Sequence, residues 1–373
     1  MKTSIILPCR NEEAALGACL DEIRAVMEGV DGGYEVIVSD SSTDRSPQIA
    51  KEHGAALVKH NKPGYGNAYL EAYKLAKGDY IFMADADGTY DFKEIPKFVE
   101  KLGEGFDLVV GNRFAGKIEG GSMPWLHRRV GNPLLSLLFR VLFRSGITDI
   151  HSGMRGIRRT ALERLELRTT GMEFATEMLI KAVRKNLSVA EVPIDYRRRK
   201  GRSKLKPLSD GWRHLRFMLL YSPMALFLVP GMLLSFSGIA SMAWLYFGSP
   251  SLVGLRFYYH PMFVSALLLV SGYQLMIFSL FARTYAATHL GEQDLPLRRL
   301  HRHFTLENGI LWGTALAAAG AAIYGLIFIE WTASGFGNLQ EAKNSIVALT
   351  LLVIGVQTVF SSFMLSMLGI REK

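Results

Sequence analysis

Four long apolar segments toward the C-terminus constrain this chain more than any other feature of its sequence. Each has about the 20 residues that a helix needs to cross a hydrocarbon core about 30 Å thick. Helices buried in soluble proteins are usually shorter, and four in succession favour membrane spans. We therefore predict an all-α transmembrane domain of four helices over residues 222–373, with spans at about 224–247, 262–283, 309–329 and 345–369.

The distribution of positive charge predicts how these spans are oriented. Lys and Arg are dense in residues 196–216, before the first span, and recur at 298–302 and in the tail. The loops at about 248–261 and 330–344 hold only Arg256 and Lys343. By the positive-inside rule, both termini and the N-terminal domain lie in the cytoplasm.

Three further features agree with this placement. The first residues, MKTSIILPCRNEE, have too short an apolar run for a cleavable signal, and two cysteines suggest no disulfide framework. The net charge of +9 is concentrated near the predicted membrane entry. Anionic membrane lipids therefore suit this charge better than nucleic acid does.

Residues 1–215 show a different pattern, in which short apolar runs alternate with helix-like stretches. Strand-like runs lie at 3–8, 34–40, 56–60, 80–85 and 107–112, with helix-like stretches near 12–29, 45–54, 66–77 and 92–103. This alternation predicts an α/β domain with a mainly parallel, doubly wound sheet. Ligands of such sheets bind beyond the carboxyl ends of the strands, where this chain has polar clusters.

The motifs in these clusters resemble those of family 2 glycosyltransferases. Successive signatures of that family are similar to PCRNEE (8–13), SDSSTD (39–44), the Gly64–Gly66 turn and DAD (85–87). The polyprenyl-phosphate sugar synthases within it, of the dolichyl-phosphate mannose synthase type, resemble this chain at GNRF (111–114), DIHSGMRGIRR (149–159) and EVPIDYRRRKGRSKL (191–205). The resemblance implies a nucleotide-sugar-binding sheet of the GT-A type.

The diphosphate of a nucleotide-sugar donor calls for Mg²⁺ or Mn²⁺ as template and Lewis acid. Such ions prefer oxygen ligands from one or two carboxylates together with substrate phosphates. Asp85 and Asp87 supply a carboxylate pair, and the resemblance implies that Asp87 is the direct ligand. Thr89 stands where relatives carry Gln, so Thr89, Asp91 or water completes the predicted shell.

The resemblance also implies a donor pocket. Asp40 would accept a hydrogen bond from a nucleobase ring N–H, and both uracil and guanine present such a donor. The alternative interpretation for Glu177 is that it lies on a solvated helix face. The predicted nucleotide-sugar-binding residues are Pro8, Arg10, Glu12, Asp40, Gly66, Asp85, Asp149, Ser152 and Glu177.

The acceptor is expected to be a lipid phosphate. A phosphate is largely anionic near neutral pH, with a second pKa of about 6, so it needs positioning by arginines more than a general base. Plain topology also explains the basic run at 197–206. The predicted lipid-phosphate-binding residues are Arg113, Arg128, Arg129, Arg202 and Lys204.

Two amphipathic stretches would bring this site to the bilayer surface. Residues 126–145 are apolar on most sides from Pro133 on, with Arg140 and Arg144 spaced four apart, as in an interfacial helix. A second such helix is expected near 208–221. The alternative is that both helices pack within the soluble domain.

Together these patterns predict a metal-dependent, inverting transfer of a hexose from a nucleotide sugar to a polyprenyl or dolichyl phosphate. The predicted catalytic residues are Asp85, Asp87, Arg113 and Arg199. A membrane polysaccharide synthase is the alternative among enzymes, and a lipid-carrier translocator or scaffold is the alternative outside them. Four spans exceed what anchoring requires, so a homo-oligomer is also possible.

Overall fold

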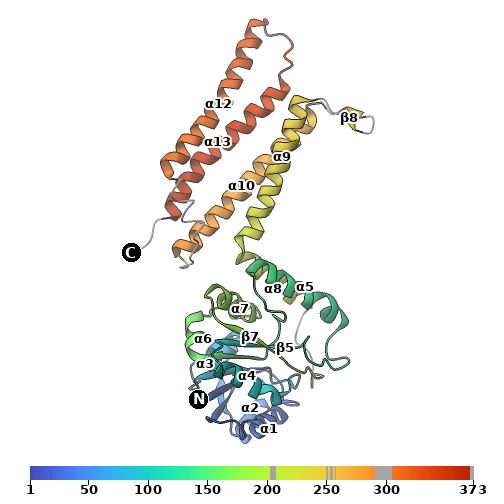
Figure 1. Ribbon diagram of the computed structural model, residues 1–373, viewed down its shortest axis with the longest axis vertical. Coiled ribbons are helices and arrows are strands. Elements are labelled where there is room, and N and C mark those ends of the chain that lie inside the picture. Colours follow the sequence, from blue (N-terminus) through green and yellow to red (C-terminus); the bar gives the residue numbers. More distant parts are fainter. Residues whose placement is uncertain (202–206, 249–250, 253–254, 257, 290–304, 370–373) are drawn as a thin grey trace. The chain divides into compact units, whose positions relative to one another are not determined.

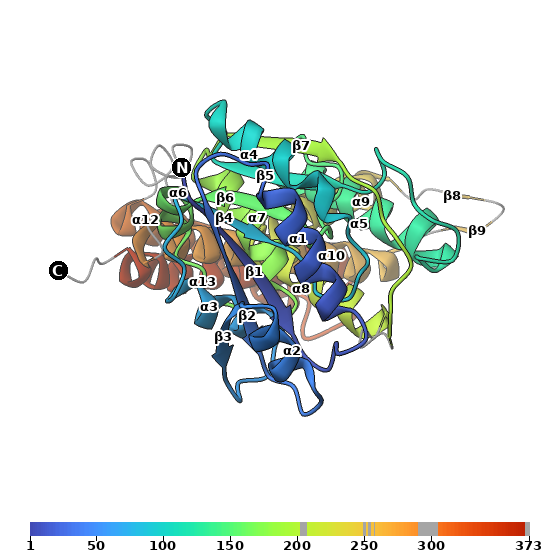
Figure 2. The ribbon, with the colours of Figure 1, turned by 90° about the horizontal axis from the view of Figure 1, so that it is seen from below.

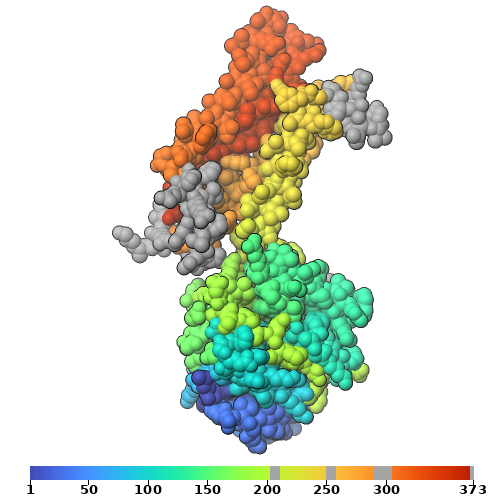
Figure 3. All heavy atoms as spheres, in the orientation of Figure 1, coloured from blue at the N-terminus to red at the C-terminus, as the bar shows by residue number. Residues whose placement is uncertain are grey.

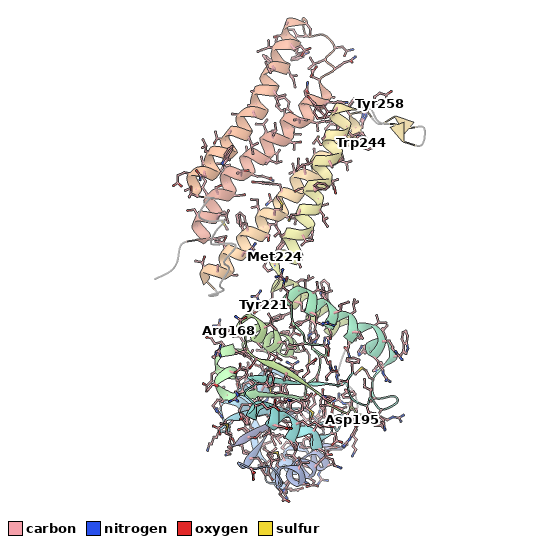
Figure 4. The ribbon with its side chains drawn as sticks, in the orientation of Figure 1. Arg168, Asp195, Tyr221, Met224, Trp244 and Tyr258 are labelled. Atoms are coloured by element: carbon pink, nitrogen blue, oxygen red, sulfur yellow. The ribbon has the colours of Figure 1, made fainter. Side chains whose placement is uncertain are left out.

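The computed structural model describes residues 1–201, 207–248, 251–252, 255–256, 258–289 and 305–369. The chain divides into two compact units, Met1–Tyr221 and Ser222–Lys373 (Figure 1). Tyr221 and Met224 are labelled on either side of this boundary in Figure 4. The first unit holds a sheet with helices on both faces, and the second consists mainly of long helices.

The sheet of the first unit has seven strands among the described residues, in the order β3-β2-β1-β4-β6-β5-β7. β1 pairs in parallel with β2 and with β4, and β2 pairs in parallel with β3. β1, β2 and β3 lie side by side in Figure 2. The α/β sheet predicted from the sequence is thereby confirmed. The strands are β1 Thr3–Cys9, β2 Tyr34–Asp40, β3 Ala56–Lys59, β4 Tyr80–Met83, β5 Leu108–Asn112, β6 Arg155–Arg158 and β7 Val189–Pro193.

β6 and β7 are the two strands that the sequence did not predict. β6 lies between β4 and β5 and runs antiparallel to both. Arg155, its first residue, therefore pairs with Met83 and Val110 near the carboxyl ends of those strands. This direction carries the preceding loop, residues 149–154, to the sheet edge where a ligand is expected.

Alternation along the strands divides the interior into two hydrophobic cores. Ile5 and Leu7 of β1 point to one face, which α1 (Leu16–Met27) and α4 (Ile95–Gly103) cover. Ile6 points to the opposite core, which includes residues of α3 (Tyr65–Tyr73) and of these helices: α5 Asn132–Phe143, α6 Arg159–Leu165, α7 Phe174–Arg184 and α8 Pro207–Leu220. Because both faces are covered, β4 (YIFM) and the centre of β1 (Ile5–Leu7) are apolar at every position.

Three shorter helices complete this unit: α2 Ser46–Glu52, the 3₁₀ turn η1 Phe92–Glu94 and the π-helix η2 His127–Gly131. α5 continues from η2 and lies on the surface, in green in Figure 3. Arg144 adopts a left-handed conformation, with φ of 52°, and ends α5. The prediction that Arg140 and Arg144 share one helical face is therefore wrong, because Arg144 lies beyond the helix.

The second unit contains, in its described part, four helices long and apolar enough to cross a membrane. They are η3 Met224–Leu228 continued by α9 Val229–Phe247, α10 His260–His289, α12 Leu306–Ala333 and α13 Ala342–Leu368. A short hairpin of β8 Ser251–Leu252 and β9 Leu255–Arg256 follows α9. Trp244 and Tyr258 lie at the end of the α9–α10 pair away from Met224 (Figure 4), as expected of interfacial aromatic residues.

Glycines let these helices pack closely in pairs. A Cβ on Gly238 of α9 would lie 2.6 Å from the amide nitrogen of Leu269 on α10. A Cβ on Gly355 of α13 would lie 2.5 Å from the amide nitrogen of Ala317 on α12. Small residues at helix contacts are typical of membrane proteins, where close backbone approach replaces the hydrophobic driving force.

Candidate active site

The Asp85–Asp87 segment lies directly beyond a buried strand. β4 ends at Met83, and the loop before β6 reaches the same edge because Met83 pairs with Arg155. A Cβ on Gly153 of that loop would lie 2.8 Å from Asp85 Oδ2. The two loops therefore meet at Asp85, in a space that only a glycine fits without a shift.

The two aspartates repel each other in this setting. Burial and the negative charge of Asp87 raise the pKa of Asp85 to about 7, although the charges of Arg199 and Arg113 act in the opposite direction. A carboxylate in such surroundings is stabilised by an additional positive charge. The pair thus has the electrostatics expected of a cation-binding site.

Asp87 is held from two sides. Its Oδ2 lies 3.2 Å from Nη1 of Arg199, whose Nη2 donates to Oε1 of Glu12 at 2.8 Å. Glu12 and Asp87 are both buried. Arg199 therefore links the loop after β1 with the loop after β4, which are far apart in the sequence.

Thr89, the predicted third metal ligand, is buried and orients Asp87. Its hydroxyl donates to Asp87 Oδ1 at 2.6 Å, and its amide donates to the same oxygen at 3.0 Å. Asp91 instead caps η1 by accepting from the amide of Lys93 at 3.0 Å, and it forms an ion pair with Arg197. Direct metal ligation by Thr89 stays a prediction.

The residues present fit a divalent ion that shares its ligands with a substrate. Within the described ranges, no group of three or more His, Cys, Asp or Glu side chains is arranged to hold a metal by itself. Mg²⁺ commonly uses one or two carboxylates together with substrate phosphates and water. Asp85 and Asp87 match that smaller requirement in number, oxygen chemistry and charge.

Asp40 ends β2 and is completely buried. Its Oδ1 accepts from the amide of Ser42 at 3.3 Å, but its Oδ2 has no hydrogen-bond partner among the described residues. A buried carboxylate oxygen without a donor is unfavourable, so this atom is available to a donor on a ligand. The geometry is consistent with the predicted contact to a nucleobase N–H.

The end of β1 and the loop after it hold three more of the predicted nucleotide-binding residues, Pro8, Arg10 and Glu12. Pro8 of β1 is half-buried and pairs with Ser39, the neighbour of Asp40. Arg10 is exposed, whereas Glu12 is buried and bound to Arg199. The parallel register of β1 and β2 brings these residues to one edge of the sheet.

Arg113 and Asp149 form a buried ion pair. Arg113 Nε and Nη2 donate to the two carboxylate oxygens at 2.8 Å each, and its amide donates to Oδ2 at 3.0 Å. Burial alone would raise the pKa of Asp149, but the charge of Arg113 lowers this pKa below its ordinary value. Arg113 also stacks on Tyr196, with its guanidinium carbon 5.2 Å from the ring centre. Asp149 thus fixes the orientation of Arg113, a role that the sequence did not predict.

Arg155 is a second residue whose role was missed. Its side chain is buried and donates to three backbone carbonyls. The distances are 2.9 Å to Ser152, 2.9 Å to Ile150 and 2.6 Å to Ala175. Arg155 therefore holds the loop that carries Ser152, whose own hydroxyl is buried without a partner among the described residues.

Glu177 and Gly66 both secure residues 168–171. Glu177 accepts from the amide of Thr169 at 2.9 Å, from its hydroxyl at 2.6 Å and from the amide of Arg168 at 3.1 Å. The amide of Gly66 donates to Gly171 O at 3.2 Å. Arg168 is labelled in Figure 4. Glu177 is buried, so the solvated-face reading is wrong, whereas sugar binding by Glu177 and Gly66 stays a prediction.

The other predicted lipid-phosphate-binding residues lie away from Arg113 in the sequence. Arg128 and Arg129 are exposed on η2, next to the surface helix α5. Arg202 and Lys204 lie outside the described residues. Of the three predicted lipid-phosphate residues that the structure describes, Arg113 is the one near enough to Asp85 for its charge to act against the rise in the pKa of that aspartate.

Comparison with known proteins agrees with the motifs. The model of glycosyl transferase family 2 matches residues 4–166, and that of the glycosyltransferase family 2 C-terminal transmembrane region matches residues 280–369. A low-salt glycan biosynthesis hexosyltransferase of Haloferax volcanii is 41% identical over 98% of this chain and 89% of its own length. The chain belongs to glycosyltransferase family 2, it is an enzyme that acts as a hexosyltransferase, and it is an integral membrane protein. The predicted family is thereby confirmed.

Two further similarities concern the first unit. A dolichyl-phosphate hexose transferase of the same organism is 34% identical, over 56% of this chain and 88% of that protein. Among solved structures, glucosyl-3-phosphoglycerate synthase from Mycobacterium tuberculosis is 24% identical with a TM-score of 0.48, over 59% of this chain and 79% of that one. At that level the structural likeness supports no conclusion about function.

Proposed function

We propose that this hexosyltransferase transfers a hexose, with inversion, from a nucleotide sugar to a polyprenyl or dolichyl phosphate. The observation that carries the proposal is the Asp85–Asp87 pair, set beside Arg199 and near Arg113 at the carboxyl edge of the sheet. Such a set binds a diphosphate through a cation and positions a second anion. The similarity to a dolichyl-phosphate hexose transferase supports the same acceptor class.

The donor binds along the edge formed by β1, β2 and β4. Asp40 Oδ2 accepts a hydrogen bond from the ring N–H of the base, which uracil and guanine both provide. UDP and GDP donors therefore both fit. Asp85 and Asp87 would hold Mg²⁺ or Mn²⁺, which would neutralise the diphosphate and make it a better leaving group.

The acceptor phosphate is positioned by arginine rather than activated by a base. Its oxygen attacks the anomeric carbon in line with the diphosphate, so that a new carbon–oxygen bond forms as the old one breaks. The electron pair of the broken bond leaves with the nucleoside diphosphate. Asp149 keeps the Arg113 guanidinium fixed by two hydrogen bonds, which favours a rigid phosphate contact.

A surface stripe on η2 and α5 provides the route to the lipid. Its exposed residues are Leu126, Val130, Leu134, Leu137 and Val141, which recur at intervals of three and four and so share one helical face. Arg128, Arg129 and Arg140 border it. We propose that this stripe and α8 rest in the bilayer interface on the cytoplasmic side, with both termini in the cytoplasm.

The test uses the purified full chain with a panel of UDP- and GDP-sugars and short polyprenyl phosphates, with and without Mg²⁺ or Mn²⁺. Mass spectrometry of the lipid should show addition of one hexose. A long polymer would support a polysaccharide synthase instead. Lipid movement without any sugar transfer would support a translocator.

Asp87→Ala should lower the transfer rate by about a hundredfold or more, because it removes preorganised stabilisation of the leaving diphosphate. The matched control is Asp31→Ala, at an exposed aspartate in a turn outside the site. Both variants should retain the melting temperature of the parent within a few degrees. A folded Asp87→Ala protein with undiminished transfer would refute the proposal.

A further inference from the structure

Residues 195–201 form a strap over the loop that carries the two aspartates. The amide of Arg197 donates to Thr89 O at 2.8 Å, and the amide of Lys200 donates to Asp87 O at 3.0 Å. A β-bridge also joins Tyr196 to Tyr90. The strap is therefore fixed to the loop through its backbone, independently of its charged side chains.

Arg199 projects from this strap between two acidic groups. Its guanidinium contacts Asp87 Oδ2 at 3.2 Å and Glu12 Oε1 at 2.8 Å, and the side chains of both acids are 8% exposed. The Arg199 Nε is buried without a hydrogen-bond partner among the described residues. The arginine thus neutralises buried acids without having all of its own donors satisfied.

The oxygen that Arg199 contacts is one that a cation at this site would use. Asp87 Oδ1 already accepts two hydrogen bonds from Thr89, which leaves Oδ2 as the more open ligand atom. Mg²⁺ binds carboxylate oxygens at about 2.0–2.1 Å, with near-octahedral geometry that tolerates little crowding. A guanidinium directed at the same oxygen and a divalent ion repel each other and compete for it.

We infer that Arg199 is an internal counterion of Asp87 that competes with the divalent ion and is released toward the donor diphosphate. This inference rests on the proposed function, because it assigns Asp85 and Asp87 to the metal. The diphosphate offers Arg199 a new anionic partner, so its binding weakens the competition. Metal and nucleotide therefore bind cooperatively, and each increases the affinity for the other by the same factor.

Arg197 provides a matched control on the same strap. It carries the same charge two residues away, but it pairs with Glu22 at 3.2 Å and with Asp91 rather than with Asp87. Replacing either arginine by glutamine removes one positive charge from the strap. Only Arg199→Gln removes the group that contacts Asp87 Oδ2.

The experiment measures Mn²⁺ binding to the purified full chain by isothermal titration calorimetry, alone and with saturating UDP or GDP. We expect Arg199→Gln to bind Mn²⁺ alone about tenfold more tightly than the parent, and to lose most of the gain that nucleotide gives, as coupling of ordinary size predicts. Arg197→Gln should stay within about twofold of the parent. Arg199→Lys, which keeps a charge without the planar fork, should be intermediate and guards against a folding defect in the glutamine variant.

Failure of this inference is distinguishable from failure of the proposed function. If the parent binds Mn²⁺ with nucleotide but Arg199→Gln binds Mn²⁺ alone no more tightly than the parent, the counterion role is overturned and the metal site stands. If Arg197→Gln tightens binding equally, the effect is general charge and the inference is again overturned. If the parent binds no Mn²⁺ with either nucleotide, the proposed metal site fails and the inference fails with it.

Discussion

At the scale of single residues, buried charges in this protein are tied to specific partners. Glu177 is 1% exposed and receives hydrogen bonds from two amides, a hydroxyl and Lys181, whose Nζ lies 2.7 Å from Oε1. Burial alone would raise the pKa of Glu177, but these donors lower this pKa below its ordinary value. The ionised carboxylate is therefore part of the folded structure of residues 168–171.

Glu177→Gln should destabilise the first unit by about 1–3 kcal/mol at neutral pH, because buried donors lose a charged acceptor. A carboxyl group whose pKa is lowered by folding contributes stability above its unfolded pKa, about 4.3, and loses it as pH falls through the lower folded value. The parent should therefore lose more stability than the variant on acidification below about pH 4.5. Thermal melts of the full chain between pH 3 and 7 measure this. Parallel pH curves for the two proteins would contradict the assignment.

At the scale of elements, α5 has a buried side and an exposed apolar side. Ser136 and Phe139 are buried against the first unit, whereas the opposite side exposes large apolar residues. Leu134 is 60% exposed and Leu137 is 53% exposed. A helix of this kind gains free energy by placing its outer face in a lipid interface.

Replacing Leu134 and Leu137 together by Glu should raise KM for a polyprenyl phosphate in vesicles by about tenfold, since each leucine loses about 1.5–3 kcal/mol of apolar burial at most. KM for a short, water-soluble acceptor should be unchanged. Leu75→Glu is the control, at a 46% exposed leucine after α3. An equal effect on both acceptors would indicate damage to the site and not to membrane contact.

β6 illustrates what local patterns miss at this scale. Its residues, RGIR, carry two arginines and do not look like a central strand. Gly156 nevertheless packs closely on α4, where a Cβ would lie 3.1 Å from Leu102 Cδ1, and Arg155 is satisfied by carbonyls of other segments. Burial of such a strand depends on partners that are distant in sequence.

At the scale of the whole molecule, the chain joins a catalytic unit to four membrane-spanning helices. The loops that precede α10 and α13 hold few positive charges, whereas the segment before α9 is strongly basic. The predicted orientation follows from this asymmetry. A homo-oligomer stays a prediction.

A cysteine introduced as Gly337→Cys, in the loop between α12 and α13, should react with a membrane-impermeant maleimide added to intact cells. A cysteine introduced as Asp31→Cys, in the first unit, should react only after the membrane is opened. The native Cys9 and Cys19 are buried, and burial raises the pKa of Cys9 to about 11 and of Cys19 to about 12, so background labelling should be low. Labelling of the Asp31→Cys protein in intact cells would reverse the assigned orientation.

The sequence by itself determined the features that depend on local order. Apolar length identified the four helices, and alternation identified the first five strands. The position of Asp85 and Asp87 after a buried strand predicted the centre of the candidate site. These signals are readable because helix length, strand period and strand ends are properties of neighbouring residues. The family motifs added candidate roles to individual positions.

Only the tertiary structure decided which charges meet. Arg113 and Asp149 are 36 residues apart, and Arg199 and Glu12 are 187 residues apart, yet each pair is in direct contact. The antiparallel strand β6, between β4 and β5, brings Asp149 to Arg113. The strap of residues 195–201, bound through its backbone, brings Arg199 to Glu12. Pairing of this kind depends on chain topology and on the need to neutralise buried carboxylates, and neither is encoded in any short stretch of sequence.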